Sequence, residues 1–183
     1  MPTWIWLFII LTGSLFAIKM AYVICTAIAL PVTQGALFVS TSKARIRACI
    51  SAVPMKAGQT LVDLGCGDGR VLRQAQKQYM VRAIGYEINW LAFLKARLLS
   101  FGLKNVEIKR QDFWSADLTG ADVVFCYLYP DVMKKLSAKL CTNLKPGAVI
   151  VSCNFILPGF EPCRVIRPVG ALQGDPVYIY CQG

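Results

Sequence analysis

Three closely spaced glycines, Gly65, Gly67 and Gly69, are the residues of this sequence best suited to hold a ligand. They follow an apolar run that contains Asp63 and ends at Leu64, in the order Asp63-Leu64-Gly65-Cys66-Gly67-Asp68-Gly69. Glycine allows the backbone to turn sharply and to approach a ligand closely. Where such a turn joins a buried strand to a helix, it presents backbone N–H groups at the helix N-terminus. The spacing therefore predicts a ligand-binding turn.

Two acids further along the chain narrow the type of ligand. Glu87 ends the second apolar run, where a carboxylate can accept both hydroxyls of a ribose. Asp112 follows the third run, where a carboxylate can accept the amino group of an adenine. The dinucleotide fingerprint G-x-G-x-x-G requires glycine at the position of Arg70, which disfavours NAD and FAD. Because the turn also has no lysine to meet a phosphate, these features predict a pocket for an adenosine without phosphates.

Composition excludes several other kinds of chemistry. None of the 183 residues is histidine, which rules out a Ser-His-Asp or Cys-His pair and any zinc site that contains histidine. The eight cysteines include no C-x-x-C pair, so we expect no bound metal. We interpret these cysteines as small buried hydrophobic residues in a reducing compartment. With 56% apolar and 16% charged residues, the chain is not a disordered tail.

Strand and helix patterns alternate beyond residue 34. Helices are predicted over 46–53, over 69–79, and after the capping residues Asn89 and Asp131. Strands are predicted near 60–64, 81–86, 106–108, 122–128, 148–151, 163–166 and 177–180. Such alternation implies an open α/β fold with helices on both faces of a mostly parallel, Rossmann-like sheet of seven strands. Because no helix separates the last two strands, one strand should be antiparallel to the rest.

Two of the predicted helices carry apolar stripes. In the helix after Asn89 the stripe consists of Leu91, Leu94, Leu98 and Phe101. In the helix after Asp131, four apolar residues should face inward, namely Met133, Leu136, Leu140 and Leu144. The lysines of that helix, Lys134, Lys135 and Lys139, should then face outward.

A long apolar segment, from Trp4 to Leu30, precedes these elements. As a helix it would be about 40 Å long, more than the ~30 Å hydrocarbon core of a bilayer. Trp4 and Trp6 at one end resemble an aromatic belt. Beyond the other end, a positive-inside flank is formed by Lys43, Arg45 and Arg47. We therefore expect a transmembrane anchor over 1–34 and a domain over 35–183 that faces the cytoplasm.

Lys19 is the only charged residue in this segment, which leaves two interpretations of it. A tilted helix would let the lysine extend to the interface, or the lysine could face a partner helix. A cleaved signal peptide is disfavoured because no basic residue precedes Trp4, and a buried hairpin because the other 29 charges all lie beyond residue 34. The N-terminus also lacks the arginines of a mitochondrial import signal, so we expect the bacterial inner membrane, with the mitochondrial inner membrane as the alternative.

Several of these motifs together resemble a known family, the class I S-adenosylmethionine-dependent methyltransferases, whose first motif typically reads D-x-G-x-G-x-G. More narrowly, the chain resembles small membrane-anchored lysine methyltransferases related to the enzymes that modify the ATP synthase c-subunit and the adenine nucleotide translocase. The resemblance covers most of the chain. Beyond the anchor and the glycine motif, it includes Gly35-Ala36-Leu37-Phe38-Val39-Ser40-Thr41, Gly85-Tyr86-Glu87, Tyr127-Leu128-Tyr129-Pro130, Leu144-Lys145-Pro146-Gly147 and Asn154-Phe155-Ile156-Leu157-Pro158-Gly159-Phe160.

The resemblance implies a binding role for each of the residues identified above. It implies S-adenosyl-L-methionine as cofactor, with Glu87 on the ribose, Asp112 on the adenine amino group and Ile88 against the adenine face. The methionine moiety would lie against Asp63, Gly65, Gly67 and Gly69. A solvated loop carboxylate is the simpler alternative for each acid taken alone.

Candidates for catalysis come from the ends of the later strands. Sites of open α/β sheets lie outside the carboxyl ends of the strands, where the candidates are Tyr127, Tyr129, Asp131, Asn154 and Glu161. The two tyrosines can both line the pocket only if their strand has already ended, because strand side chains alternate between faces. Asp131 is equally well explained as a helix cap.

The net charge of +10 favours an anionic partner. Lipid headgroups beside the anchor are a better candidate than nucleic acid, because the basic residues are scattered along the chain. We therefore expect a membrane-anchored methyltransferase acting on a lysine of a membrane protein. One alternative is methylation of a lipid, quinone or small amine at the membrane surface. Another is a cofactor-binding membrane subunit without turnover.

Overall fold

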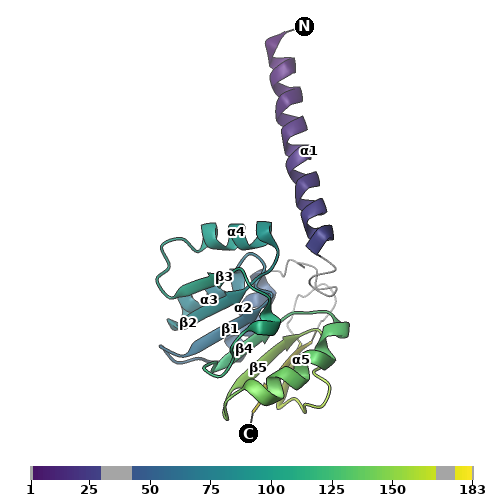
Figure 1. Ribbon diagram of the computed structural model, residues 1–183. Helices are drawn as coiled ribbons and strands as arrows, with labels where there is room; N and C mark the ends of the chain where they lie inside the picture. Colours follow the sequence, from purple (N-terminus) through teal and green to yellow (C-terminus); the bar gives the residue numbers. More distant parts are fainter. Residues whose placement is uncertain (1, 30–42, 168–175, 183) are drawn as a thin grey trace.

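The computed structural model describes residues 2–29, 43–167 and 176–182, as one long N-terminal helix beside an α/β domain (Figure 1). The helix, α1 (Thr3–Ala29), rises away from the domain. Its segment Thr3–Ile24 is long and apolar enough to cross a bilayer, and none of its residues is buried. The motif at 35–41 lies outside the described residues.

The domain is built on a seven-stranded sheet in the order β3-β2-β1-β4-β5-β7-β6. All neighbouring pairs are parallel except those that involve β7, which is antiparallel to both β5 and β6. The predicted fold class, including its one antiparallel strand, is therefore confirmed. The strands are β1 (Thr60–Leu64), β2 (Arg82–Tyr86), β3 (Val106–Lys109), β4 (Val123–Cys126), β5 (Val149–Cys153), β6 (Arg164–Ile166) and β7 (Val177–Cys181).

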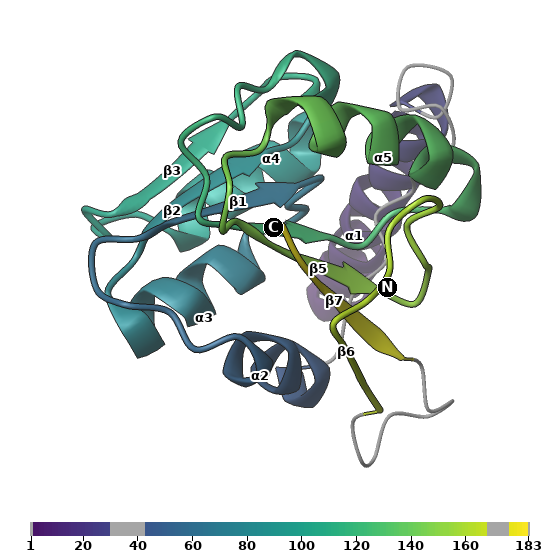
Figure 2. The same cartoon turned by 90° about the horizontal axis from the view of Figure 1, so that it is seen from below.

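Helices cover both faces of this sheet (Figure 2). On one face lie α2 (Lys43–Ala52) and α3 (Arg70–Tyr79), and on the other lies α5 (Pro130–Asn143). A short 3-10 helix, η1 (Phe113–Ser115), follows β3. The helix α4 (Trp90–Leu99) runs along the β3 side of the sheet and contacts both β3 and α1 (Figure 1).

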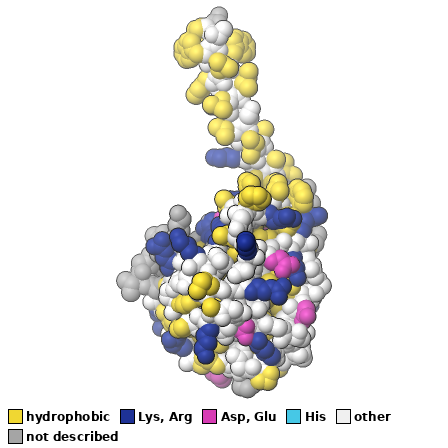
Figure 3. All heavy atoms as spheres, turned by 90° about the vertical axis from the view of Figure 1, so that its left-hand side faces the viewer, with side chains coloured by type: hydrophobic (Ala, Val, Ile, Leu, Met, Phe, Trp, Pro, Cys, Tyr) yellow, Lys and Arg dark blue, Asp and Glu magenta, His cyan; other side chains and the backbone are white. Residues whose placement is uncertain are grey.

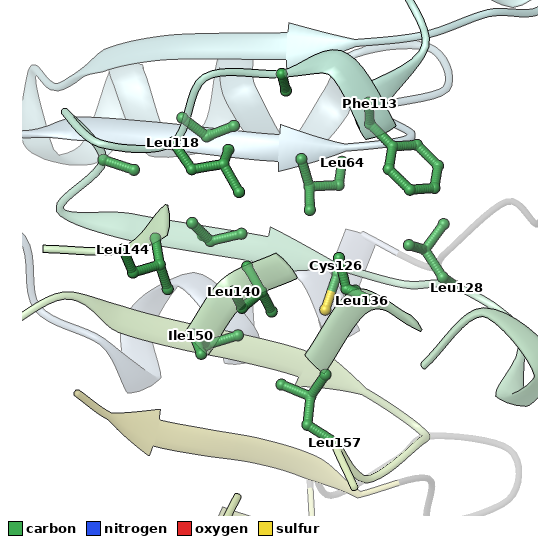
Figure 4. Packing of buried hydrophobic residues seen from close by; sticks show 14 of the residues in the cluster. Leu64, Phe113, Leu118, Cys126, Leu128, Leu136, Leu140, Leu144, Ile150 and Leu157 are labelled. Carbon is green, nitrogen blue, oxygen red and sulfur yellow. The ribbon is translucent and has the colours of Figure 1, made fainter. Parts of the chain in front are cut away.

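The core under α5 shows how the sequence pattern produces this packing (Figure 4). The four inward residues predicted for α5 are buried, and two of them, Leu136 and Leu140, are fully enclosed. They pack against the side chains of alternate strand residues, such as Leu64, Cys126 and Ile150. The lysines Lys134 and Lys135 are exposed as expected. Lys139 instead turns back to donate hydrogen bonds to the carbonyl oxygens of Trp114 and Ala116.

Two expectations about cysteine and capping are wrong. Cys163 and Cys181 form a disulfide between the start of β6 and the end of β7, so these two are not free thiols. Four other cysteines, Cys49, Cys66, Cys126 and Cys153, are buried as expected, but Cys141 is exposed. Asp131 does not cap α5, because Pro130 begins the helix and Tyr129 takes the capping position without a side-chain hydrogen bond.

The apolar stripe of α4 faces away from the core. Its buried residues are Ala92, Phe93 and Ala96. The predicted stripe residues Leu94, Leu98 and Phe101 are exposed, Phe101 to 90%. In a globular protein, the apolar stripe of a surface helix ordinarily faces the core. Core packing therefore does not explain the exposed apolar residues of α4.

Candidate functional site

The glycine turn, here called the elbow (residues 65–69), connects the carboxyl end of β1 to the start of α3. Gly65, Gly67 and Gly69 all have positive φ, of 76°, 55° and 74°, a region that residues with a Cβ adopt only at a cost. The N–H groups of Gly65 and Cys66 both donate to the Tyr86 carbonyl, each at 3.0 Å. The elbow is therefore fastened to the end of the neighbouring strand β2.

A salt bridge joins the elbow to the first residue of α3. The Arg70 guanidinium donates from Nε and Nη2 to the two carboxylate oxygens of Asp68, at 2.7 and 2.6 Å. Lys95 of α4 lies 3.6 Å from the same carboxylate. Burial opposes ionisation of Asp68, but its bonds to Arg70 prevail and lower the pKa of this carboxyl below its usual value. Sequence reasoning missed this pair.

Glu87 lies directly against the elbow. Its Oε2 accepts the Gly67 N–H at 2.9 Å, and its Oε1 accepts the Asn89 N–H at 2.7 Å. Burial raises the pKa of this carboxyl, although the backbone N–H groups of Asn89, Gly67 and Ile88 act in the opposite direction. The fold thus brings Glu87 into contact with the elbow glycines, although these residues are distant in the sequence.

Asp63 is the most unusual group of the site, because its carboxylate is almost fully enclosed within β1, with 3% of the residue exposed. Within the parts of the chain that the structure describes, no donor forms a hydrogen bond to it. Burial, and then the charges of Glu87 and Asp68, raise its pKa well above the usual value. A cationic ligand would stabilise a buried carboxylate that experiences the negative charges of two other acids. The residues therefore fit S-adenosylmethionine, whose methionine part carries an ammonium and a sulfonium.

The residues predicted for the adenine follow the carboxyl ends of β2 and β3. Glu87 N–H donates to the Lys109 carbonyl at 3.0 Å, which places the carboxyl ends of β2 and β3 side by side. Asp112 follows β3 and is half-buried, and one of its oxygens accepts the Trp114 N–H at 3.0 Å as the cap of η1. Ile88 is also half-buried. The predicted cofactor residues thus lie in or after the carboxyl-terminal halves of three adjacent strands, β1, β2 and β3.

Of the five catalytic candidates, Tyr127 and Asn154 form a hydrogen bond with each other. The strand β4 ends at Cys126, so Tyr127 lies just beyond the strand. The Asn154 side chain, which follows the end of β5, donates to the Tyr127 hydroxyl at 3.2 Å. Asn154 also has a left-handed backbone, with φ of 73°. Tyr129 packs against the core under α5, while Asp131 and Glu161 are exposed.

Gly85, inside β2, is a further residue of the site that the sequence reasoning did not single out for its shape. A Cβ at this position would lie 2.5 Å from Leu72 Cδ1 and 2.6 Å from Cys66 Sγ. Only glycine allows the elbow and α3 to pack this closely on β2. The signal was available, since a glycine in a strand often marks a close backbone approach.

Comparisons with known proteins agree with this geometry. Residues 63–164 match the family model described as the ANTKMT methyltransferase domain. The chain is 31% identical over 156 residues to a protein-lysine N-methyltransferase of Saccharolobus islandicus, an alignment that covers 80% of this chain and 93% of that protein. It is 35% identical over 133 residues to the mouse adenine nucleotide translocase lysine N-methyltransferase, covering 70% of this chain and 57% of the mouse protein.

Further similarity comes from a human protein and from a solved structure. The human lysine N-methyltransferase of the ATP synthase c-subunit is 28% identical over 158 residues, which cover 84% of this chain and 66% of that protein. A structure described as an RNA methyltransferase from Salinibacter ruber, bound to S-adenosyl-L-homocysteine, has a TM-score of 0.72 and 32% identity, covering 78% of this chain and 93% of that one. With the elbow and its acids, these matches show that the chain belongs to the S-adenosylmethionine-dependent protein-lysine N-methyltransferase family.

Proposed function

We propose that this protein is a membrane-anchored enzyme that transfers the methyl group of S-adenosylmethionine to a lysine side chain of a membrane protein. The single observation that carries the proposal is the position of α1. This exposed apolar helix contacts α4, which begins just after the carboxyl end of β2, so a bilayer around α1 would lie close to the site. The relatives named for an adenine nucleotide translocase and for a part of ATP synthase support the same class of acceptor.

We assign the cofactor residues as follows. Asp63 would accept the ammonium group of the methionine part, and the elbow glycines would let that part approach the backbone. Glu87 would accept the ribose hydroxyls, and the second oxygen of Asp112 the adenine amino group. Ile88 would pack against the adenine ring. The cofactor supplies a methyl group already activated by the sulfonium, so the protein needs mainly to align the acceptor with that methyl group.

On the acceptor side, we assign positioning roles to Tyr127 and Asn154. The Asn154 amide donates to the Tyr127 hydroxyl and thereby orients it beyond the carboxyl end of β4. A lysine acceptor must lose its proton before it can attack the methyl group. Desolvation of the acceptor at the site would favour this loss, because it lowers the pKa of an ammonium group.

The membrane and its sidedness belong to the same proposal. We place α1 across a bacterial inner membrane with the domain on the cytoplasmic side, following the positive flank of the helix. The Cys163–Cys181 disulfide tests this placement, because the cytoplasm keeps most thiols reduced. In intact cells, a cytoplasmic domain should have both thiols open to alkylation without added reductant. An intact disulfide in cells would contradict the sidedness but not the chemistry.

Methyl transfer can be tested with the full chain in lipid vesicles or native membranes. The protein is incubated with S-adenosylmethionine carrying a labelled methyl group, and the label is traced into protein, lipid and RNA fractions. We expect acid-stable label on methylated lysine in a membrane protein, and none with Glu87→Ala. Label in lipid or quinone would favour the small-acceptor alternative, label in RNA would favour the chemistry named for the Salinibacter ruber structure, and binding without transfer would favour a non-catalytic role.

A further inference from the structure

The outward face of α4 carries large apolar side chains that the domain leaves uncovered. Trp90, Leu94 and Leu98 lie four residues apart, so they share one face of the helix, and Phe101 continues it. Their exposed fractions run from 48% for Trp90 to 74% for Leu98 and 90% for Phe101. A contiguous exposed apolar face of this kind marks an interaction surface. We call these four residues the α4 face.

Basic side chains border the α4 face. By helical geometry, Lys95 lies on one side of it and Arg97 on the other, and both are exposed, although Lys95 is also paired with Asp68 at 3.6 Å. The Arg110 guanidinium lies over the Trp90 ring, 5.0 Å from its centre. The one acid on the neighbouring strand β3, Glu107, is already shared by two cations, at 3.4 and 3.6 Å. The surroundings of the face are therefore positively charged.

The α4 face lies on the side of the domain from which α1 departs. α1 contacts α4, and in Figure 1 α4 crosses the end of the domain nearest to α1. Figure 3 shows hydrophobic side chains continuing from α1 onto the adjoining end of the domain, with Lys and Arg side chains beside them. A bilayer entered by α1 would thus have its surface near α4.

From these observations we propose that the α4 face docks onto the surface of the bilayer that α1 spans. The inference rests on the membrane anchoring proposed above and adds a second contact, which fixes how the site is oriented toward the membrane. An apolar helical stripe bordered by basic residues is the pattern of a helix lying in the membrane interface. Trp90 suits the boundary between headgroups and acyl chains, and the basic border suits anionic headgroups.

Docking also explains how the protein can carry an apolar α4 face without aggregating. In water, four exposed apolar residues beside one another would favour aggregation. Held against lipid by α1, the same residues would be covered for as long as the protein stays in the membrane. The carboxyl edge of the sheet would then stay at a constant height relative to a lysine near the bilayer surface.

The proposal is tested by the fluorescence of Trp90 in the full chain. With Trp4, Trp6 and Trp114 replaced by Phe, Trp90 is the only tryptophan. The protein is placed in vesicles of phosphatidylcholine and phosphatidylglycerol, with or without bromine on the acyl chains. We expect brominated lipid to reduce Trp90 emission by about half or more, because the residue lies at the acyl boundary. A second variant that keeps only Trp114, which packs on the core under α5, should lose much less emission.

Charge substitutions then separate docking from anchoring. The variant Leu94→Glu, Leu98→Glu, Phe101→Glu should still float with vesicles through α1 and still bind cofactor, but its Trp90 should no longer be quenched. A matched variant places three glutamates on the exposed side of α5, at Ala138, Cys141 and Thr142, and should leave quenching unchanged.

Each other outcome identifies which proposal fails. A chain that floats with vesicles but shows equal Trp90 emission in both lipids overturns docking and leaves anchoring intact. Blue-shifted emission that brominated lipid does not quench also overturns it, because protein rather than lipid would then cover the face. A chain that does not float contradicts anchoring as well, whereas quenching without methyl transfer supports docking and contradicts the proposed function.

Discussion

Replacing Glu87 is the most direct test of the cofactor site, because the contacts of this residue can be counted. An ionised carboxylate has roughly four acceptor positions on its two oxygens. The Gly67 and Asn89 N–H groups each occupy one, at 2.9 and 2.7 Å. The positions that remain match the two hydroxyls of a ribose. A hydrogen bond to a charged group contributes about 1.5–3 kcal/mol.

The expected loss follows from that count. Glu87→Ala should remove both ribose bonds, about 3–6 kcal/mol, which corresponds to a Kd for S-adenosylmethionine about 10²- to 10⁴-fold higher. It also leaves the Gly67 and Asn89 N–H groups without their acceptor, at about 1–3 kcal/mol of stability each if they stay buried. Glu87→Gln keeps one acceptor oxygen but turns an amide toward one of these N–H groups. We expect its affinity to lie between the wild-type and alanine values.

Titration calorimetry of the full chain in detergent measures these affinities. The matched control is Glu107→Ala, an exposed acid on the adjacent strand, which should leave the Kd unchanged. An S-adenosylhomocysteine analogue lacking the ribose 2′-hydroxyl completes a double-mutant cycle, and Glu87→Ala should no longer distinguish it from the parent ligand. A Glu87→Ala protein that binds cofactor within about twofold of wild type, or still discriminates the analogue, would refute the assignment.

Four further changes have defined expectations. Burial raises the pKa of Asp63, so the contribution of this residue to stability is full at acid pH and is lost as pH rises through the raised value. In urea unfolding without cofactor, Asp63→Asn should therefore gain stability relative to wild type as pH rises. The same variant should bind S-adenosylmethionine more weakly. Gly85→Ala should cost about 1–3 kcal/mol by overpacking against Leu72 and Cys66, with Gly120→Ala as the neutral control in the same unfolding assay. Tyr127→Phe removes the acceptor of the Asn154 amide, so kcat should fall about tenfold while the cofactor Kd stays constant, and an unchanged kcat would remove the positioning role. Reduction of Cys163–Cys181, which closes a short loop, should lower stability by about 2–4 kcal/mol, and a reductant without effect on the unfolding midpoint would show that the pair is not oxidised in solution.

The elements that could be predicted from the sequence are those whose signals are local. The strands β1 and β2 are buried apolar runs, and the glycines between β1 and α3 leave the chain few other conformations. The strands β1 and β2 are parallel neighbours, so their carboxyl ends lie at the same edge of the sheet. Glu87 and the elbow follow these two ends and are therefore adjacent. The inward face of α5 likewise follows from helical spacing alone.

Features that depend on distant parts of the chain could not be predicted in the same way. The stripe of α4 is visible in the sequence, but periodicity does not reveal whether a stripe faces the core or the outside, and the small residues Ala92 and Ala96 take the inward side. The Tyr127–Asn154 pair depends on where β4 ends. The disulfide could not be chosen from eight cysteines, because connectivity is not encoded in spacing.

The two buried acids of the site, Asp63 and Glu87, explain why the motif around Asp63 was informative about the ligand. Asp63 and Glu87 are both buried, and the charge of Glu87 makes ionisation of Asp63 harder, so an ionised pair destabilises the protein without ligand. A fold that served stability alone would gain from an apolar residue at position 63. A bound cation would favour the ionised form of Asp63 and stabilise the folded state by mass action. Asp63 is therefore the residue through which a positively charged cofactor would be selected over a neutral nucleoside.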